Sequence, residues 1–269
     1  MDQQHAAVIQ KVVRRFSQLP KIQAVAVAGS QVAGTTNKDS DIDIYIYSIT
    51  EIPSKLRTAI GAEFSDDVEI NDFWGPGNEW TDRETGIHVD AVFWTTGWIK
   101  EQVERVLVRH EASMGYTTCF WHTVRNSQRE FDRNNWLSEL QKQAMQDYPE
   151  PLVKAIVANN YPVLRQTASS YLKQLEKAAY RADVVSLNHR TAALFASYFD
   201  ILFAINRVTH PGEKRLIEHA ENFCPKRPSA MRAEIHAVLE ASVCKSTGIG
   251  TAINRLIDSL DEMLESEGL

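Results

Sequence analysis

Apolar and polar positions alternate with two different periods in the first 130 residues, so this part of the chain predicts both strands and helices. The clearest strand is Asp41–Tyr47, in which isoleucine alternates with aspartate or tyrosine, the period of a half-buried strand. Apolar residues at helical spacing predict an amphipathic helix over residues 4–18. The same patterns predict further strands at Ile22–Ala28, Val68–Ile70, Ile87–Trp94 and Tyr116–Val124, helices at 53–64 and 97–110, and a loop at Asn71–Thr85.

Beyond about residue 130 the strand period disappears and helical spacing takes over. Prolines interrupt this spacing, and we expect helix breaks near Pro149, Pro162, Pro211 and Pro228. The expected helices are 136–147, 151–159, 163–180, 183–207, 212–222, 229–243 and 248–266. The chain therefore divides into a mixed α/β half and an all-helical half, which we assign to domains 1–130 and 131–269.

Composition excludes several classes of protein. The 29 basic and 35 acidic residues give a formal charge of −6, so a surface that coats nucleic acid is not expected. Hydrophobic residues amount to 43%, enough to fill a core and to exclude global disorder. The three cysteines form neither a zinc motif nor a disulfide scaffold. The first residues lack the apolar core of a signal peptide, and the most apolar later stretch, Ala192–Ile205, is too short to span a bilayer. We therefore expect a cytoplasmic protein without a membrane partner.

Candidate chemistry begins at a glycine–serine pair that ends a predicted strand. Gly29 lets a ligand approach the backbone closely, and Ser30 adds a hydroxyl to the amides of a helix start, an arrangement that suits phosphate. Asp41 and Asp43 stand two positions apart on the next strand, so both carboxylates face one side. A hard cation such as Mg²⁺ relieves their repulsion and also binds phosphate oxygens. Asp90, in another strand-like run, joins them if the two strands pair. This pattern predicts metal-assisted phosphoryl or nucleotidyl transfer.

The same residues resemble the signature of the DNA polymerase β-like nucleotidyltransferase superfamily. The resemblance rests on Gly29-Ser30, the later Gly34, the run Ser40-Asp41-Ile42-Asp43-Ile44, and the later carboxylate Asp90. It implies a small mixed sheet with flanking helices, so that the expected fold class is α+β, with this sheet followed by an all-α helical bundle. It also implies two Mg²⁺ ions and transfer of a nucleoside monophosphate from a nucleoside triphosphate, ATP by default, with loss of pyrophosphate.

The resemblance also implies a role for each of these residues. Gly29 and Ser30 hold the β- and γ-phosphates. Asp41 and Asp43 bridge the two metals. Asp90 binds the metal nearer the acceptor and takes the proton of the acceptor hydroxyl.

A weaker resemblance covers most of the chain. It rests on Gly75–Trp80, Phe120–His122, Leu202–Arg207 and Pro211–Lys214, which look like a bacterial family of stand-alone nucleotidyltransferases. These proteins join the catalytic domain to a C-terminal helical domain and are related in architecture to aminoglycoside and lincosamide adenylyltransferases. The match supports the fold more than the substrate, although it includes antibiotic resistance among the expected roles.

Charge favours a small acceptor. Between Glu63 and Asp90 there are nine acidic residues, and Arg83 is the one Lys or Arg. Because an RNA would meet phosphate repulsion there, we expect a small, cationic, hydroxyl-bearing acceptor, although a solvated acidic loop explains the same pattern. Glu79 is the acidic residue that we assign to acceptor binding.

The sequence around six other side chains suggests a role or a position for each. Trp74 and Trp80, which stand in the Gly-Pro loop, are candidates to stack on a base or sugar ring, and we assign them to acceptor binding. Lys214, just after a predicted helix break, either reaches the triphosphate or is a solvated surface lysine. We assign Trp94 and Trp98 to the core, and His88 to packing or support.

Two other functions stay open from the sequence. One is a toxin-type nucleotidyltransferase that modifies a protein or a tRNA. The other is a non-catalytic regulator that binds nucleotide, and the three retained aspartates argue against it.

Overall fold

The computed structural model describes residues 3–28, 41–73, 75–243 and 248–269. They group into two compact units, Met1–Val103 with Thr123–Gln146 and Glu104–His122 with Asp147–Leu269. Each unit contains a hydrophobic core. The domain limits 1–130 and 131–269 stay a prediction.

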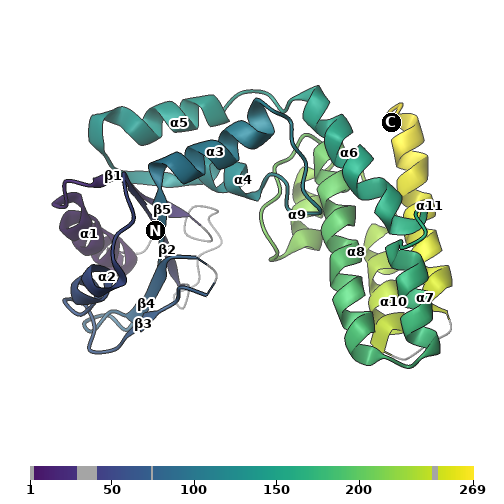
Figure 1. Ribbon diagram of the computed structural model, residues 1–269, viewed down its shortest axis with the longest axis horizontal. Coiled ribbons are helices and arrows are strands. Elements are labelled where there is room, and N and C mark those ends of the chain that lie inside the picture. Colours follow the sequence, from purple (N-terminus) through teal and green to yellow (C-terminus); the bar gives the residue numbers. More distant parts are fainter. Residues whose placement is uncertain (1–2, 29–40, 74, 244–247) are drawn as a thin grey trace. The chain divides into compact units, whose positions relative to one another are not determined.

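Within the described residues, six strands of the first unit form one mixed sheet (Figure 1). Its order is β3-β4-β5-β2-β1-β6, in which β2 and β5 run parallel and the other neighbours antiparallel. The elements of this unit are α1 (Gln3–Ser17), β1 (Ile22–Ala28), β2 (Ile42–Ser48), α2 (Ser54–Gly61), β3 (Val68–Ile70), β4 (Gly77–Thr81), β5 (His88–Thr95), β6 (Gln128–Asp132), a 3₁₀ turn (Arg133–Asn135) and α5 (Trp136–Ala144), while α3 (Thr96–Leu107) and α4 (Cys119–Asn126) belong partly to each unit. This arrangement confirms the expected mixed sheet with flanking helices.

One face of the sheet is apolar because its strands alternate. Ile42, Ile44 and Ile46 are completely buried there. They join the core that α1 closes with its apolar stripe, which repeats every three to four residues from Val8 to Phe16. The periodicity read from the sequence is therefore the reason that α1 and β2 pack against each other.

The opposite face of the sheet is open at the start of β2 and covered toward its end. Asp41, just before the strand, is exposed, while Asp43 and Tyr45 are half-buried. Tyr47 is completely buried, and its ring lies 5.4 Å from that of Trp136 in α5. Polar and aromatic side chains of β2 thus follow a gradient of burial along one face.

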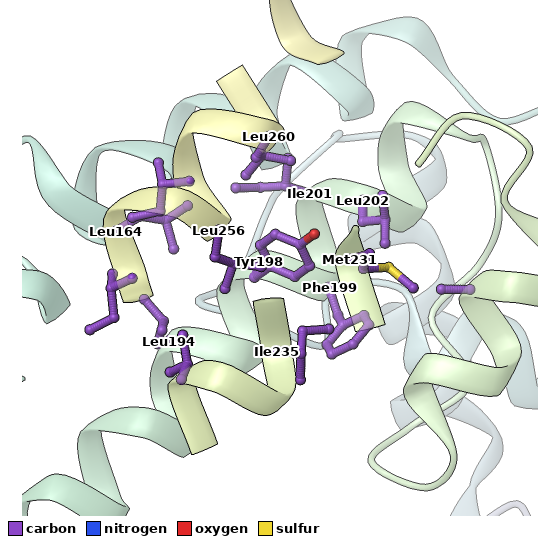
Figure 2. Packing of buried hydrophobic residues seen from close by; sticks show 14 of the residues in the cluster. Leu164, Leu194, Tyr198, Phe199, Ile201, Leu202, Met231, Ile235, Leu256 and Leu260 are labelled. Carbon is purple, nitrogen blue, oxygen red and sulfur yellow. The ribbon is translucent and has the colours of Figure 1, made fainter. Parts of the chain in front are cut away.

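The second unit is a bundle built around α8, which is the central helix because apolar residues occupy all of its sides over the second half of its length. Figure 2 shows Tyr198 and Leu202 of α8 packed among side chains of the surrounding helices, such as Leu164, Ile235 and Leu256. The helices of this unit are α6 (Glu150–Arg165), α7 (Tyr171–Tyr180), α8 (Val184–Ile205), α9 (Leu216–Phe223), α10 (Met231–Val243) and α11 (Ile249–Ser266). Among the described helices, none combines the length and the apolarity that crossing a bilayer needs.

A buried carboxylate lies inside this bundle. Asp200 is 1% exposed and accepts hydrogen bonds from the Thr117 amide at 3.0 Å, the Thr117 hydroxyl at 2.6 Å and the Asn160 side-chain amide at 3.4 Å. Despite these donors, burial raises the pKa of Asp200 to about 7. Asp200 of α8 therefore binds the segment before α4 through Thr117, and ionising this carboxyl group in its buried position is unfavourable.

Two secondary-structure predictions are wrong in the first 130 residues. The predicted strand Tyr116–Val124 is largely the helix α4, and the last strand of the sheet is β6. Trp121 and Val124, three residues apart, are both fully buried, which is helical spacing. The stretch was predicted as a strand because it is rich in β-branched and aromatic residues. The predicted loop 71–85 contains the strand β4.

Pro162 does not end a helix, contrary to expectation, because α6 continues through it to Arg165. A proline loses its own backbone bond, but its carbonyl still accepts. The Pro162 carbonyl receives the amides of Gln166 and Thr167, and Leu164 is fully buried. These contacts hold the last turn in place.

Candidate active site

The parallel strands β2 and β5 bring two of the predicted carboxylates together. Asp43 is the register partner of Asp90, so the two residues stand side by side on one face, about 5 Å apart at the strand spacing. Both are half-buried. Continuing the register by one residue places Asp41 across from His88, on the same face. The sheet therefore groups the three aspartates expected from the sequence at its open end.

The predicted phosphate cradle begins next to this pair. Ala28, the last residue of β1, is the register partner of Asp43 on the side away from β5. Gly29 and Ser30 follow Ala28 in the sequence and lie outside the described residues. Their contact with phosphate stays a prediction.

A row of carboxylates extends from Asp90 across the sheet. Glu79 of β4 is the register partner of Asp90, and Glu69 of β3 is the partner of Glu79. Partners in adjacent strands share a face, so Glu69, Glu79, Asp90 and Asp43 form one line, which we call the acidic row. Such a row attracts cations and repels phosphate backbones.

Two side chains hold Glu79 in this row. The Asn71 side-chain amide donates to Glu79 Oε1 at 2.5 Å, and His88 Nε2 lies 3.5 Å from Glu79 Oε2. His88 is 40% exposed, so it belongs to the open face and not to the core. His88 therefore lies beside a carboxylate of the row, and its supporting role stays a prediction.

Arg57 of α2 anchors the turn between β3 and β4. It is only 4% exposed, and its guanidinium donates to the Gly77 carbonyl at 3.0 Å and to Asp72 Oδ1 at 2.6 Å. Its charge also lies over the ring of Phe93, 5.1 Å from the centroid. Sequence reasoning missed Arg57, because an arginine in an amphipathic helix looks like a surface residue.

Of the two tryptophans predicted near the acceptor, the structure describes one. Trp80 is 3% exposed and stacks on Phe64 in the core, with ring centroids 5.9 Å apart. It alternates with Glu79 and faces the other side of the sheet, so the acceptor contact predicted for Trp80 is withdrawn. Trp74 lies outside the described residues.

Lys214, the predicted triphosphate contact, belongs to the second unit. It is exposed and precedes α9. Its contact with phosphate stays a prediction.

Aromatic side chains continue the open face beyond the carboxylates. Tyr45 and Trp94 share this face with Asp43 and Asp90, and their rings lie 4.7 Å apart. Trp98 of α3 lies 5.4 Å from Trp94 and is 39% exposed. The core position predicted for Trp98 is therefore wrong, and Trp94 is only half-buried.

The carboxylates suit Mg²⁺ as a shared ligand, not as a closed cage. In the parts of the chain that the structure describes, no three His, Cys, Asp or Glu side chains gather closely enough to hold a metal alone. Mg²⁺ is typically bound through one or two carboxylates together with water and substrate phosphates. The Asp43–Asp90 pair, with Asp41 beside it, matches that donor set.

The comparisons with known proteins give a match that includes the carboxylate site. No curated protein matches the chain significantly. Among solved structures, a nucleotidyltransferase-like protein from Exiguobacterium sibiricum 255-15 is 12% identical, with a TM-score of 0.45 over 96% of this chain and 75% of that chain. Residues 9–113 match the family model of the nucleotidyltransferase domain, and this stretch includes Asp41, Asp43 and Asp90. The segment that builds the carboxylate site is thus similar to nucleotidyltransferase domains.

Proposed function

We propose that this protein is a Mg²⁺-dependent nucleotidyltransferase. It moves a nucleoside monophosphate, AMP by default, from a nucleoside triphosphate to a hydroxyl of a small cationic acceptor and releases pyrophosphate. The observation that carries the proposal is the register of Asp43 with Asp90, inside the stretch that matches the nucleotidyltransferase domain. We assign the reaction to the cytoplasm.

Asp41, Asp43 and Asp90 are the residues that would hold the metal ions. Bound Mg²⁺ supplies positive charge that stabilises the negative charge of the reacting phosphates. The fit rests on adjacent half-buried carboxylates, whose mutual repulsion a cation relieves.

The chain's own groups bind and orient the substrates. Backbone amides at Gly29 and Ser30 bind the β- and γ-phosphates. The acceptor oxygen forms a bond to the α-phosphorus, and the bond from that phosphorus to the bridging oxygen breaks. Pyrophosphate leaves with the electron pair, and the hydroxyl proton passes to the Asp90 carboxylate.

The acidic row is the feature that supports the proposed acceptor class. Glu79 and Glu69 continue directly from Asp90, so a molecule whose hydroxyl lies at Asp90 meets two further carboxylates. Ammonium groups of an aminoglycoside-like molecule match that row, while an RNA backbone does not. Trp74 remains a proposed contact for a ring of the acceptor. Adenylylation of such an antibiotic would confer resistance.

A transfer screen tests this function. Each of the four α-³²P-labelled triphosphates is incubated with the protein and Mg²⁺, and with pooled aminoglycosides, tRNA or no added acceptor. We expect label on an aminoglycoside and at least a 100-fold loss in Asp43→Asn and Asp90→Asn. Glu51→Gln, an exposed carboxylate outside the site, is the matched control.

Two results would contradict the proposal. Full activity in both aspartate variants would remove the carboxylate pair from the mechanism. Strong labelling of tRNA or of the protein itself, with no small molecule labelled, would replace the acceptor class with a macromolecule.

A further inference from the structure

Tyr45, Trp94 and Trp98 form a contiguous aromatic patch on the carboxylate face. Their rings contact in sequence, Tyr45 to Trp94 at 4.7 Å and Trp94 to Trp98 at 5.4 Å between centroids. Tyr45 and Trp94 stand on the same strands as Asp43 and Asp90 and point to the same side. The patch is therefore an extension of the candidate active site along the strands.

The patch is supported from the side by a buried tyrosine of the same face and stays partly exposed. Tyr47, which is fully buried, packs its ring 6.1 Å from that of Trp94. Trp98 stands in the first turn of α3, where its amide donates to the Thr95 hydroxyl at 3.3 Å. Trp98 nevertheless keeps 39% of its surface exposed. The rings are thus positioned before any ligand arrives, which lowers the cost of binding.

The spacing from the carboxylates suits one nucleotide. Tyr45 lies two residues beyond Asp43, or about 7 Å along a strand. In a nucleotide, a single ribose separates the α-phosphate from the base, a span of the same order. A nucleotide whose α-phosphate lies at Asp43 and Asp90 can therefore place its base against these rings.

The side chains around Asp43 and Asp90 differ on two sides, and each side suits one of the two proposed substrates, the acceptor or the nucleotide. Toward β4 the neighbouring side chains are the carboxylates Glu79 and Glu69, which suit a cation. Along the strands the neighbouring side chains are aromatic, which suits a flat ring without net charge. The base of the triphosphate is such a ring.

We propose that the patch of Tyr45, Trp94 and Trp98 is the base-binding subsite for the nucleoside triphosphate, a proposal that rests on the proposed function. Stacking accepts every base, because each has a π-face. A purine covers more of the rings than a pyrimidine does. The subsite therefore favours ATP and GTP over CTP and UTP and separates the two purines weakly.

The test compares a ligand that has a base with one that has none. Isothermal titration calorimetry measures the binding of Mg·ATP and of Mg·tripolyphosphate to the full-length wild type, Trp98→Phe, Trp98→Leu and Trp98→Ala. Leucine keeps an apolar side chain without a ring, so it tests stacking even if the alanine variant folds poorly. Phe73→Ala removes an aromatic side chain that is 88% exposed elsewhere in the same unit and is the matched control.

We expect Trp98→Leu and Trp98→Ala to weaken ATP binding about 5- to 150-fold, the usual contribution of one stacked base. Tripolyphosphate affinity should not change, Trp98→Phe should retain most of the ATP affinity, and Phe73→Ala should bind both ligands as the wild type does. The wild type should bind ATP and GTP more tightly than CTP and UTP.

Three results would overturn the subsite. Equal effects of Trp98→Leu on ATP and tripolyphosphate would show a loss that is not specific to the base, and no effect on either would show that Trp98 takes no part. A Trp98→Leu variant that loses affinity for neomycin while binding ATP normally would assign the patch to the acceptor. A wild type that binds neither ATP nor tripolyphosphate would instead refute the proposed nucleotidyl transfer itself, and the subsite with it.

Discussion

The buried carboxylate of Asp200 should make the stability of the helical unit depend on pH. Its pKa is raised from 3.8 to about 7 by burial. In the unfolded chain the same group loses its proton near pH 4, so between about pH 4 and pH 7 the folded state binds more protons than the unfolded state does. The stability contributed by this group is therefore fully present below pH 4 and is lost as pH rises toward 7.

The magnitude follows from the shift. About three pKa units at 1.36 kcal/mol each amount to a loss of about 4 kcal/mol across this range. Asp200→Asn removes the titration while keeping the shape of the side chain. In the variant the new amide can donate to the Thr117 hydroxyl, which in turn can donate to the Ser113 carbonyl, already 3.4 Å away. The local hydrogen bonds can therefore be satisfied without a charge.

Urea unfolding from pH 4 to pH 8, followed by the helical circular dichroism signal, measures this effect. Hydrogen exchange of the α8 amides localises it to the second unit. We expect the stability of Asp200→Asn relative to the wild type to rise by about 4 kcal/mol from pH 4 to pH 8. Parallel stability curves for the two proteins would refute the reasoning, as would a variant that loses stability relative to the wild type as pH rises.

Three further changes test the sheet unit. Asp43→Asn should raise the metal-free melting temperature, because two like charges separated by the strand spacing of about 5 Å would repel by about 0.8 kcal/mol even in water; a gain that does not shrink at high salt would contradict this cause. Arg57→Gln should cost about 2 kcal/mol in chemical denaturation, because it loses two charged hydrogen bonds, whereas Arg83→Gln, which breaks an exposed pair with Asp66, should leave the stability nearly unchanged; equal losses would show that Arg57 anchors nothing. Gly77→Ala should cost about 1–3 kcal/mol, because a Cβ would lie 3.0 Å from the Asn71 carbonyl oxygen, while Gly97→Ala, with open space in α3, should gain about 1 kcal/mol; a tolerated Gly77→Ala in thermal melts would refute the close approach.

Periodic elements were predictable from the sequence because burial repeats along them. The helix α8 and the strand β2 each show their pattern within one segment, and so does the pair Asp41 and Asp43. The strand β4 was not predicted because Gly75 and Pro76 precede it and Gly77 is its first residue, and these residue types indicate a loop. Its strand conformation depends on pairing with β3 and β5, which no local pattern reports.

The site was predictable as far as residue types determine it. The spacing of the three aspartates in the sequence indicates metal chemistry without knowledge of the sheet. The alignment of Glu79 with Asp90, in contrast, follows only from the order of the strands in the sheet. Arg57 and Trp98 were missed for opposite reasons. Arg57 is charged but buried, because it anchors the turn between β3 and β4. Trp98 is aromatic but exposed, because it lies on the same face as the carboxylates. Composition assigns both to the wrong environment.

The parallel pairing of β2 with β5 also determines when the site can form. Asp43 and Asp90 are separated in sequence by α2, β3 and β4, and β5 enters the sheet between β4 and β2. Pairings of this kind form slowly, because closing a long loop costs conformational entropy before the stabilising contacts between the strands can form. A nascent chain that ends before β5 has one carboxylate strand and no partner for it. During refolding, catalytic competence should therefore appear with the insertion of β5, after the helices have formed.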